Sequence, residues 1–530
     1  MKRNRLLTFV LVLLILLSGP LARNGGSALA APLKQTLKPV PSALELAVNS
    51  IGGKDALTGL KTITVQGAGT RWTFDESYQV ELRAARTGAF TETVSYDLAG
   101  NKLRLDYVRQ GLNSNRKITE VTAANLGYVA GQDANFGPPA NKVMTSDRWA
   151  STLKQQRLLN PHLILRDILA NPGIAKDGGE ALLDGSVHHL LVVSDTVAPM
   201  TLYVNAATGQ IAKLATMEND HLRRDVMLDV FYYHWQPVGD GLFFPTELYI
   251  AVDGQITHKE IRTAITVNQP LASDLFAFPK DVSPVFDKEL ATWGEFNSQF
   301  YQMFDALGFP RAGTQTKVEA KELAPGVFHL TGGTHNTLVV EQAKGVVVIE
   351  TPLQELRSAA ILDWIKQKFS NKPITHAIIT HHHTDHTSGL RSFVAAGATA
   401  VVHAKAADFF AKIFQASSKI QPDDLELHPV AAKIDTVPAD GKYQIDDATN
   451  PITVYPIANT HAEDMVIIYV GGGRVLFVTD LYSPAANADP GAGGKLINQA
   501  ITDRSLDVAT IAGGHGGTIA FADFQALLKK

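Results

Sequence analysis

Apolar and polar residues alternate along much of the first half of the chain, which is typical of strands that bury one face. The alternation predicts strands at residues 61–67, 78–83, 102–109, 190–194, 200–205, 211–216, 226–234 and 248–252. Thr208 and Gly209 stand between two of these segments and predict a hairpin turn. Helices are expected at residues 42–51 and 150–169. Residues 31–280 are therefore expected to form a mainly antiparallel β domain with few helices.

The pattern changes after residue 322, where apolar strands and amphipathic helices begin to alternate. Strands are predicted at residues 327–330, 336–341, 345–350 and 375–380, and helices at residues 356–369 and 387–396. Such alternation is typical of α/β layering, so residues 322–530 are expected to form a separate α/β domain. Residues 281–321, with a predicted helix at 288–307 and a break near Gly313, are expected to be a helical linker.

The composition narrows the chemistry that the chain can carry out. Its 530 residues include 48 basic and 52 acidic residues and no cysteine. Disulfides and thiolate ligands are therefore excluded, and any transition metal must be held by His, Asp or Glu. The nearly balanced charge offers no basic surface for nucleic acid, so the expected partner is a small-molecule substrate. The pattern leaves the oligomeric state open.

The N-terminus has the three parts of an export signal. Positive residues at positions 2, 3 and 5 precede a short apolar run at 6–17 and an Ala28-Leu29-Ala30 cleavage pattern. The run is shorter than the ~20 residues that span a bilayer. Residues 1–30 are therefore expected to be a cleaved signal peptide, with an uncleaved anchor as the alternative. The mature chain is expected in the periplasm or outside the cell, without a stable membrane span.

The most informative segment is a histidine-rich turn between a predicted strand and a predicted helix, residues 380–389 (THHHTDHTSG). His381 and His383 are two residues apart, so an extended backbone presents them on one side. Asp385 and His386 follow at the turn. Nitrogen and oxygen ligands at this spacing suit two adjacent cations, and α/β proteins place their sites at strand ends.

Two ions need more ligands than one turn supplies. His461, Asp480 and His515 each stand just after another predicted strand. Glycines on both sides of His515 allow the backbone to approach closely. These three side chains are expected to meet the histidine-rich turn at one edge of a sheet.

An alternative is a histidine-rich loop with adventitious metal affinity, but such a loop predicts no partners at other strand ends. His382 lies between two candidate ligands and is expected to point away from the site as a spacer. His335, His376 and His403 are expected not to be ligands. Because His335 follows the Gly332-Gly333 loop, it is a candidate substrate contact.

The H-x-H-x-D-H segment, followed in order by His461, Asp480 and His515, resembles the metallo-β-lactamase superfamily. The resemblance covers residues 322–530 and implies an αββα sandwich there. It also implies two zinc ions. The first ion would bind His381, His383 and His461. The second would bind Asp385, His386 and His515, and Asp480 would bridge both.

Two positions depart from the family pattern. Glu350 stands at the end of the third strand, where family members usually have Asp, so the support of the metal-binding turn is expected to differ. Ala462-Glu463-Asp464 follows His461 in place of the usual Thr and Gly. Within the resemblance, Asp480 and the lack of cysteine disfavour β-lactam hydrolysis.

The resemblance implies a hydrolase that uses a hydroxide held between two zinc ions to cleave an ester, thioester, lactone or amide. Asp385 or Asp480 would transfer the proton. One alternative is a mononuclear iron dioxygenase on the same scaffold. Another is a periplasmic carrier of apolar ligands, because residues 31–280 resemble the half-barrels of lipoprotein-carrier domains.

Overall fold

The computed structural model describes residues 42–73, 77–80, 84–111, 115–131, 142–196, 198–296, 316–353 and 355–529. Pro41–Lys530 form one compact unit. The expected signal peptide and the end of the expected linker helix, residues 297–307, lie outside the described residues. Among the helices of the described ranges, none has both the length and the apolar character that a membrane crossing requires.

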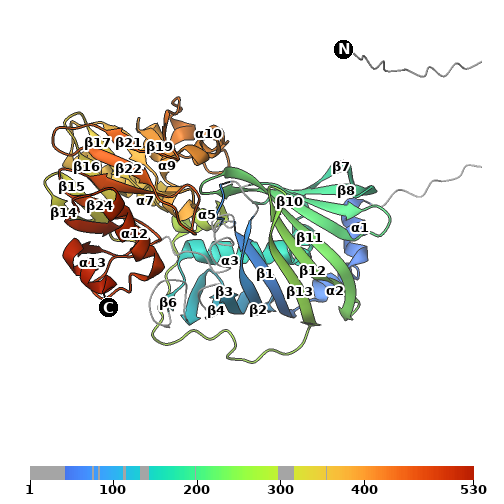
Figure 1. The fold of residues 1–530 in the computed structure, drawn as a ribbon. Coiled ribbons are helices and arrows are strands. Elements are labelled where there is room, and N and C mark those ends of the chain that lie inside the picture. The colour runs from blue at the N-terminus through green and yellow to red at the C-terminus, as the bar shows by residue number, and fades with distance from the viewer. Residues whose placement is uncertain are drawn as a thin grey trace, which may run out of the picture. The chain divides into compact units, whose positions relative to one another are not determined.

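The described part of the N-terminal domain contains one antiparallel sheet of thirteen strands (Figure 1). The strands are β1 Thr62–Thr73, β2 Ala85–Asp97, β3 Lys102–Gly111, β4 Asn115–Ala123, β5 Leu126–Gly131, β6 Lys142–Val143, β7 Ala175–Leu183, β8 Ser186–Val193, β9 Met200–Asn205, β10 Ile211–Asp220, β11 Arg224–Gly239, β12 Leu242–Val252 and β13 Gln255–Val267. Two meanders meet where β1 pairs with β13. The expected antiparallel β domain is confirmed.

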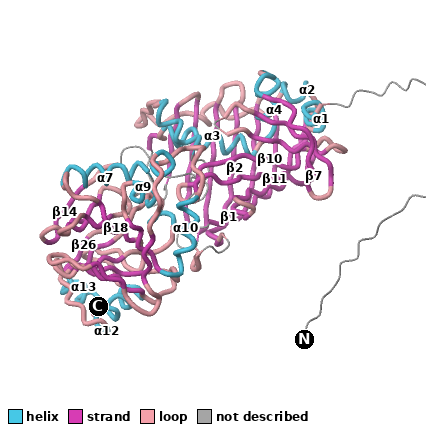
Figure 2. The backbone as a smooth tube through the Cα atoms, turned by 90° about the horizontal axis from the view of Figure 1, so that it is seen from above, coloured by secondary structure: helices cyan, strands magenta, loops and turns pink. Residues whose placement is uncertain are grey.

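Helices cover one face of this sheet (Figure 2). They are α1 Ala43–Ser50, α2 Lys54–Gly59, α3 Ser146–Leu159 and α4 Pro161–Ala170. The prediction of one helix at residues 150–169 is wrong, because Asn160 leaves the helical conformation between α3 and α4. Pro161 opens α4 and has no N–H with which to continue the hydrogen bonds of α3.

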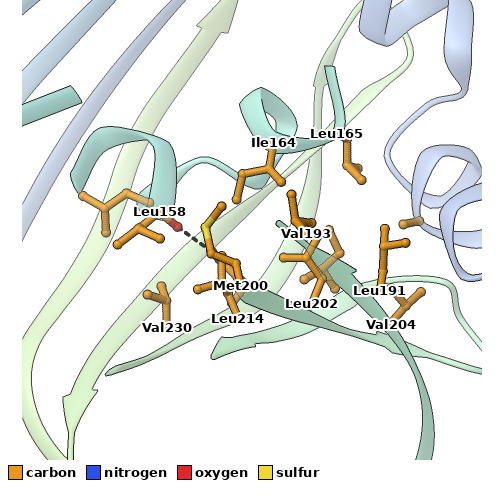
Figure 3. Close-up of a cluster of buried hydrophobic side chains, with 14 of the residues drawn as sticks. Leu158, Ile164, Leu165, Leu191, Val193, Met200, Leu202, Val204, Leu214 and Val230 are labelled. Carbon is orange, nitrogen blue, oxygen red and sulfur yellow. Dashed lines mark hydrogen bonds between the residues drawn. The ribbon is translucent and has the colours of Figure 1, made fainter. Parts of the chain in front are cut away.

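Apolar side chains of α3 and α4 pack onto the sheet. Leu158, Ile164 and Leu165 are buried and point into a cluster on β8, β9, β10 and β11 (Figure 3). Their partners include Leu191, Val193, Met200, Leu202, Val204, Leu214 and Val230. Burial of each such side chain contributes roughly 1.5–3 kcal/mol. Helix side chains therefore fill this part of the sheet face.

The strand predicted at residues 78–83 is wrong in its described part. Residues 77–80 form a bend between β1 and β2, and residues 81–83 lie outside the described residues. Glu463 holds the bend: its N–H donates to the Tyr78 carbonyl (2.8 Å), and its Oε1 accepts from the Val80 N–H (3.1 Å). Backbone groups that a strand would pair within the sheet are thus taken by a residue of the C-terminal domain.

The C-terminal domain contains two sheets. The first has seven strands: β14 Glu319–Ala324, β15 Val327–Thr331, β16 Thr337–Glu341, β17 Val346–Ile349, β18 Ile374–Ile378, β19 Thr399–His403 and β20 Ile434–Val437. The second has six: β21 Tyr443–Ile445, β22 Ile452–Pro456, β23 Val466–Val470, β24 Val475–Val478, β25 Thr510–Gly513 and β26 Thr518–Ala520. Both counts refer to the described residues.

The remaining helices of the described residues are α5 Lys288–Phe296, α7 Glu355–Lys368, α8 Thr384–Thr387, α9 Leu390–Ala395, α10 Ala407–Gln415, α11 Asp424–Leu427, α12 Gly491–Asp503 and α13 Phe521–Leu528. Of these, α5 precedes the two-sheet domain. The helix expected at 387–396 is α9, and a separate turn, α8, contains the second half of the histidine-rich segment. The domain boundaries at residues 30, 280 and 321 stay predictions.

Three buried clusters define the layers of this domain. Ile378 of the first sheet and Phe477 of the second share a core between the sheets. A second core joins the first sheet to α7, α9 and α10, with Phe393 fully buried. A third joins the second sheet to α12 and α13 through Ile497 and Phe524. The order is therefore helix, sheet, sheet, helix, which confirms the expected αββα sandwich.

A buried ionic network joins the two domains. Arg224, at the start of β11, forms an ion pair with Glu355 and lies 3.4 Å from Asp423. Its guanidinium also donates to the Ser418 hydroxyl (2.9 Å) and the Gln421 carbonyl (3.0 Å). Its side chain is 1% exposed, so solvent screens these contacts little. The β10–β11 turn is thus fixed to the C-terminal domain.

Candidate metal centre

Several strands of the C-terminal domain end at one edge. β17 and β18 run parallel, as do β24 and β25, so the residues after them begin at matching ends. The Val466 N–H donates to the Thr380 carbonyl (2.8 Å) and joins the two sheets there. The histidine-rich turn follows β18, and the downstream candidates follow β22, β24 and β25. The ends of neighbouring strands therefore bring residues that are far apart in the chain to one edge of the domain.

His381, His383 and His461 form a first group of facing side chains. His461 Nε2 lies 3.3 Å from His381 Nε2 and 3.1 Å from His383 Nδ1. Asp480 completes the group, with Oδ2 at 2.8 Å from His461 Nε2 and 3.5 Å from His381 Nε2. All four ligand atoms lie within 4.8 Å of one another.

His335, Asp385, His386 and His515 form a second group, whose ligand atoms also lie within 4.8 Å of one another. Asp385 Oδ2 is 2.9 Å from His335 Nε2 and 3.6 Å from His386 Nε2. Asp480 Oδ1 is 3.1 Å from His386 Nε2 and 3.0 Å from His515 Nε2. One carboxylate thus faces both groups, with a different oxygen toward each.

The structure brings together all seven residues that the sequence singled out, and it adds His335 to them. His335 was expected not to be a ligand, yet its ring lies in the second group. His376 and His403 belong to neither group of the described residues. His382 is a spacer, as expected: its Nδ1 lies 2.7 Å from Asp464 Oδ1 and outside both groups.

Glu350 supports the histidine-rich turn. Its Oε1 accepts hydrogen bonds from the N–H (3.0 Å) and the hydroxyl of Thr380, and its Oε2 accepts one from His386 Nδ1. Glu350 is fully buried and has a φ of 70°, a backbone conformation that costs roughly 1–3 kcal/mol in a residue with a side chain. The side chain of Glu350 therefore forms hydrogen bonds to the histidine-rich turn, although it is longer than the Asp usual at this position.

The N-terminal domain reaches the first group through a backbone carbonyl. His383 Nε2 donates to the Ser77 carbonyl across 3.0 Å. This bond places the proton on Nε2, so Nδ1 of His383 faces His461 with its lone pair. Residue 77 belongs to the bend that Glu463 holds, and Glu463 also pairs with Lys405 (2.9 Å).

The Ala462-Glu463-Asp464 departure thus has a structural explanation. Glu463 fixes the bend of the N-terminal domain, and Asp464 orients His382. Asn459 holds the start of this segment, because its Oδ1 accepts from the N–H groups of His461 (2.7 Å) and Ala462 (2.8 Å). The segment therefore connects the candidate ligand His461 to Glu463 and Asp464, whose contacts support the histidine-rich turn.

Burial and neighbouring charges set the protonation of the groups. Burial, together with the His382 and His461 rings, lowers the pKa of His383 to about 4. Burial alone would raise the pKa of Asp480, but His386 and hydrogen bonds from the surrounding histidines hold it well below its usual range. A neutral imidazole and an ionised carboxylate are the forms that bind a metal ion.

The donor set fits bound cations. A tetrahedral zinc ion with bonds of about 2.0–2.1 Å separates its ligands by about 3.3 Å, close to the spacings in both groups. The ligand nitrogens of the first group face one another within 4.8 Å, an arrangement that a cation between them stabilises. In the second group, the buried Nε2 of His386 faces Asp480 Oδ1 at 3.1 Å. Its Nδ1, in contrast, is held by Glu350.

The family assignment follows from this part of the chain. Residues 330–515 match the model of the metallo-beta-lactamase superfamily. The match contains the histidine-rich turn and ends at His515, the last of the seven residues. This region of the chain therefore belongs to the metallo-β-lactamase superfamily.

Solved structures with similarity to this region include several metallo-β-lactamases. The metallo-beta-lactamase from Pontibacter korlensis is 18% identical, with 40% of this chain and 100% of that chain covered and a TM-score of 0.32. The enzyme from Hirschia baltica is 20% identical over 40% of this chain and 96% of that one, with a TM-score of 0.31. The DIM-1 metallo-beta-lactamase is 16% identical over 40% and 96%, with a TM-score of 0.32.

Two contacts of the site could not be found from the sequence. Ser77 contributes a carbonyl, which every residue type has, so its identity carries no signal. His335 is an isolated histidine, and no other candidate ligand stands at a characteristic spacing from it in the sequence. The Gly332-Gly333 pair before it was the one indication of a tight loop near the site.

Proposed function

We propose that this protein is a dinuclear zinc hydrolase that cleaves an ester, thioester, lactone or amide of a small molecule. The carboxylate of Asp480 carries the proposal, because its two oxygens face two separate groups of ligand atoms. A single ion would leave one of the groups without a cation.

The roles follow the two groups. His381, His383 and His461 would hold the first ion, and Asp385, His386 and His515 the second, with Asp480 shared. When bound, the ions would polarise a substrate carbonyl and lower the pKa of water toward neutrality. Glu350 and Ser77 orient the rings so that the ligand nitrogens face inward.

The side-chain exposures indicate where the substrate enters. The side chains of His461, His515 and Asp385 are 29%, 27% and 22% exposed, whereas those of His381 and His386 are fully buried. The centre therefore opens on the side of His461, His515 and Asp385. Asp385 and Asp480 are the candidate proton acceptors, and the more exposed Asp385 is the more accessible to a bound substrate.

The test is a hydrolysis screen of the full chain loaded with zinc. Thioesters, lactones, carboxylic esters, β-lactams and phosphodiesters should be compared with and without chelator, with the metal content measured in parallel. We expect hydrolysis of at least one acyl substrate, loss of activity with the chelator and recovery with zinc. A protein that holds two zinc ions and cleaves no acyl substrate contradicts the proposal.

The alternative of a mononuclear iron dioxygenase gives a different result in the same preparation. It predicts one iron ion per chain, oxygen consumption, and oxidised rather than hydrolysed product. The two groups joined by Asp480 favour two ions, and the metal content of the purified protein decides between these activities.

We also propose that the protein is exported to the periplasm or beyond, because residues 1–30 combine a positive start, a short apolar run and a cleavage pattern. N-terminal sequencing of the protein from its own cell envelope or medium tests this. A start shortly after Ala30 is expected, whereas an intact Met1 in the cytoplasmic fraction contradicts export.

A further inference from the structure

His335 occupies a loop between β15 and β16 and points into the second group of ligand atoms. The residue is 4% exposed. Its Nε2 lies 2.9 Å from Asp385 Oδ2, and its ring centroid lies 4.2 Å from that of His515 and 5.0 Å from that of His386. Nε2 of His335 thus lies among the ligand atoms of the second group, which Asp480 also faces.

The other ring nitrogen of His335 already has a partner. Nδ1 lies 2.8 Å from the Thr334 hydroxyl, which can accept a hydrogen bond from Nδ1–H, and in that tautomer Nε2 has the lone pair that a cation would bind. The Thr334 carbonyl lies 3.2 Å from Nδ1 of His515 and accepts a hydrogen bond from that ring. Residue 334 therefore orients two rings of the group, as the outer partners of metal-bound histidines do.

The loop that carries His335 is fixed in place. The Asn336 N–H donates to the Gly514 carbonyl (2.7 Å), and its side-chain amide donates to the carbonyls of Gly513 (2.9 Å) and Gly516 (2.8 Å). These contacts tie the loop to the segment that presents His515. A loop held at three points keeps the ring in the group at little further entropic cost.

We propose that His335 is a ligand of the second ion, together with Asp385, His386, His515 and the shared Asp480. This inference rests on the proposed function, since it requires that the group bind a metal ion. The second ion then has three nitrogen and two oxygen donors from the protein, one nitrogen more than the sequence motif provides. Such a site holds its ion more tightly than three ligands and a shared carboxylate would.

A substitution of His335 distinguishes a ligand from a hydrogen-bond donor. In His335→Gln, the side-chain amide can still donate to Asp385 but provides no imidazole nitrogen. We expect the affinity for the second zinc ion, measured by chelator competition, to fall by tenfold or more. Thr334→Val, which removes the partner of Nδ1 and keeps the ring, is expected to give a smaller loss.

His329→Gln is the matched control. His329 is also buried, donates from Nε2 to the Gly513 carbonyl (2.9 Å), and belongs to neither group of ligand atoms. Its substitution should leave both zinc affinities unchanged. If His335→Gln and His329→Gln bind the second ion equally well, His335 is a structural hydrogen-bond donor and the inference is wrong.

Cadmium NMR of the metal-substituted full chain gives a second readout that does not depend on activity. The cadmium shift reports the number of nitrogen donors, so His335→Gln should move one resonance and leave the other. Two unmoved resonances overturn the inference. If the wild-type protein binds two ions but hydrolyses none of the substrates, the proposed function is wrong and this ligand assignment still holds. If the wild-type protein binds no metal ion, both are wrong.

Discussion

The imidazole of His383 donates from Nε2 to the carbonyl of Ser77, 306 residues earlier in the chain, across 3.0 Å. One residue belongs to the histidine-rich turn and the other to the N-terminal β domain. The contact directs Nδ1 of His383 toward the first group of ligand atoms. The N-terminal domain is therefore part of the support of the histidine-rich turn.

Glu463 tests this role, because it holds the bend that contains Ser77. Glu463→Ala removes the acceptor of the Val80 N–H, so the Ser77 carbonyl is expected to shift away from His383. Loss of such an outer partner typically lowers metal affinity about 10- to 100-fold. Chelator competition should show this loss at the first zinc ion.

Lys405→Met is the control for that substitution. It removes the ion pair with Glu463 and leaves the hydrogen bonds between Glu463 and the bend in place. Its zinc affinity should stay close to wild type. Equal affinities in Glu463→Ala and wild type would show that the bend does not orient His383.

Substitutions of Asp480 and Asp385 should affect the affinities for the two ions differently. Asp480 faces both groups, so Asp480→Asn is expected to weaken both ions. Asp385 belongs to the second group only, so Asp385→Asn should leave the affinity for the first ion unchanged. Loss of Lewis-acid stabilisation worth several kcal/mol corresponds to a rate decrease of more than about a hundredfold in either variant. Metal content and kcat should be measured together.

The exposed His428 provides the control, since it belongs to neither group. His428→Ala should keep two zinc ions and full activity. Two ions retained by Asp480→Asn at wild-type affinity would mean that this carboxylate does not bridge the groups.

Glu350→Gln tests the support of the turn. The carboxylate accepts from Thr380 and from His386, whereas an amide has a single acceptor oxygen and turns an N–H toward one of these donors. His386 should lose its fixed orientation, and the affinity for the second ion should fall about 10- to 100-fold. Glu341→Gln, at a partly exposed ion pair with Lys372, should change the affinity for neither ion. An unchanged affinity of Glu350→Gln for the second ion would refute this role.

The buried network around Arg224 predicts the coupling of the two domains. Arg224→Met removes the buried cation that pairs with Glu355, whereas Asp423 keeps its ion pair with Arg391. Breaking a buried ion pair typically costs about 3–5 kcal/mol. Denaturant unfolding of the variant should show a lower midpoint and two separate transitions. Lys102→Met, which removes a partly exposed ion pair with Asp97, should cost less than about 1 kcal/mol. A variant at Arg224 with the wild-type midpoint would contradict the coupling.

His162 predicts a stability that falls in acid. Burial lowers the pKa of His162 to about 3, and its ring stacks on Phe244 with centroids 3.7 Å apart. The folded state thus keeps the ring neutral while the unfolded chain binds a proton below pH ~6.5. This contribution to stability is complete above pH ~6.5 and is lost progressively as the pH falls toward 3.

His162→Phe isolates the effect. Between pH 7 and 5 the wild type should lose about 2 kcal/mol of unfolding free energy through this group, and the variant should lack that loss. The exposed His428, replaced by Phe, serves as the control and should keep the wild-type slope. Parallel pH profiles for wild type and His162→Phe would show that His162 is not the titrating group.

The sequence by itself determined the mainly antiparallel character of the first half and the seven residues that converge on the two groups, and its resemblance to a known family implied the αββα sandwich. Its patterns are local: alternation marks a strand with one buried face, and residue type at a strand end marks a ligand. His381 and His383 are two residues apart, and Asp480 directly follows an apolar strand. These features need no knowledge of the distant partner.

Tertiary structure alone decided the rest. The Ser77 carbonyl reaches His383 because a bend of one domain docks against Glu463 of the other, and a carbonyl leaves no trace in the residue type. His335 enters the second group because Asn336 ties its loop to the glycines around His515. Such contacts depend on how surfaces far apart in the chain pack, and local hydrophobic patterns do not encode that packing.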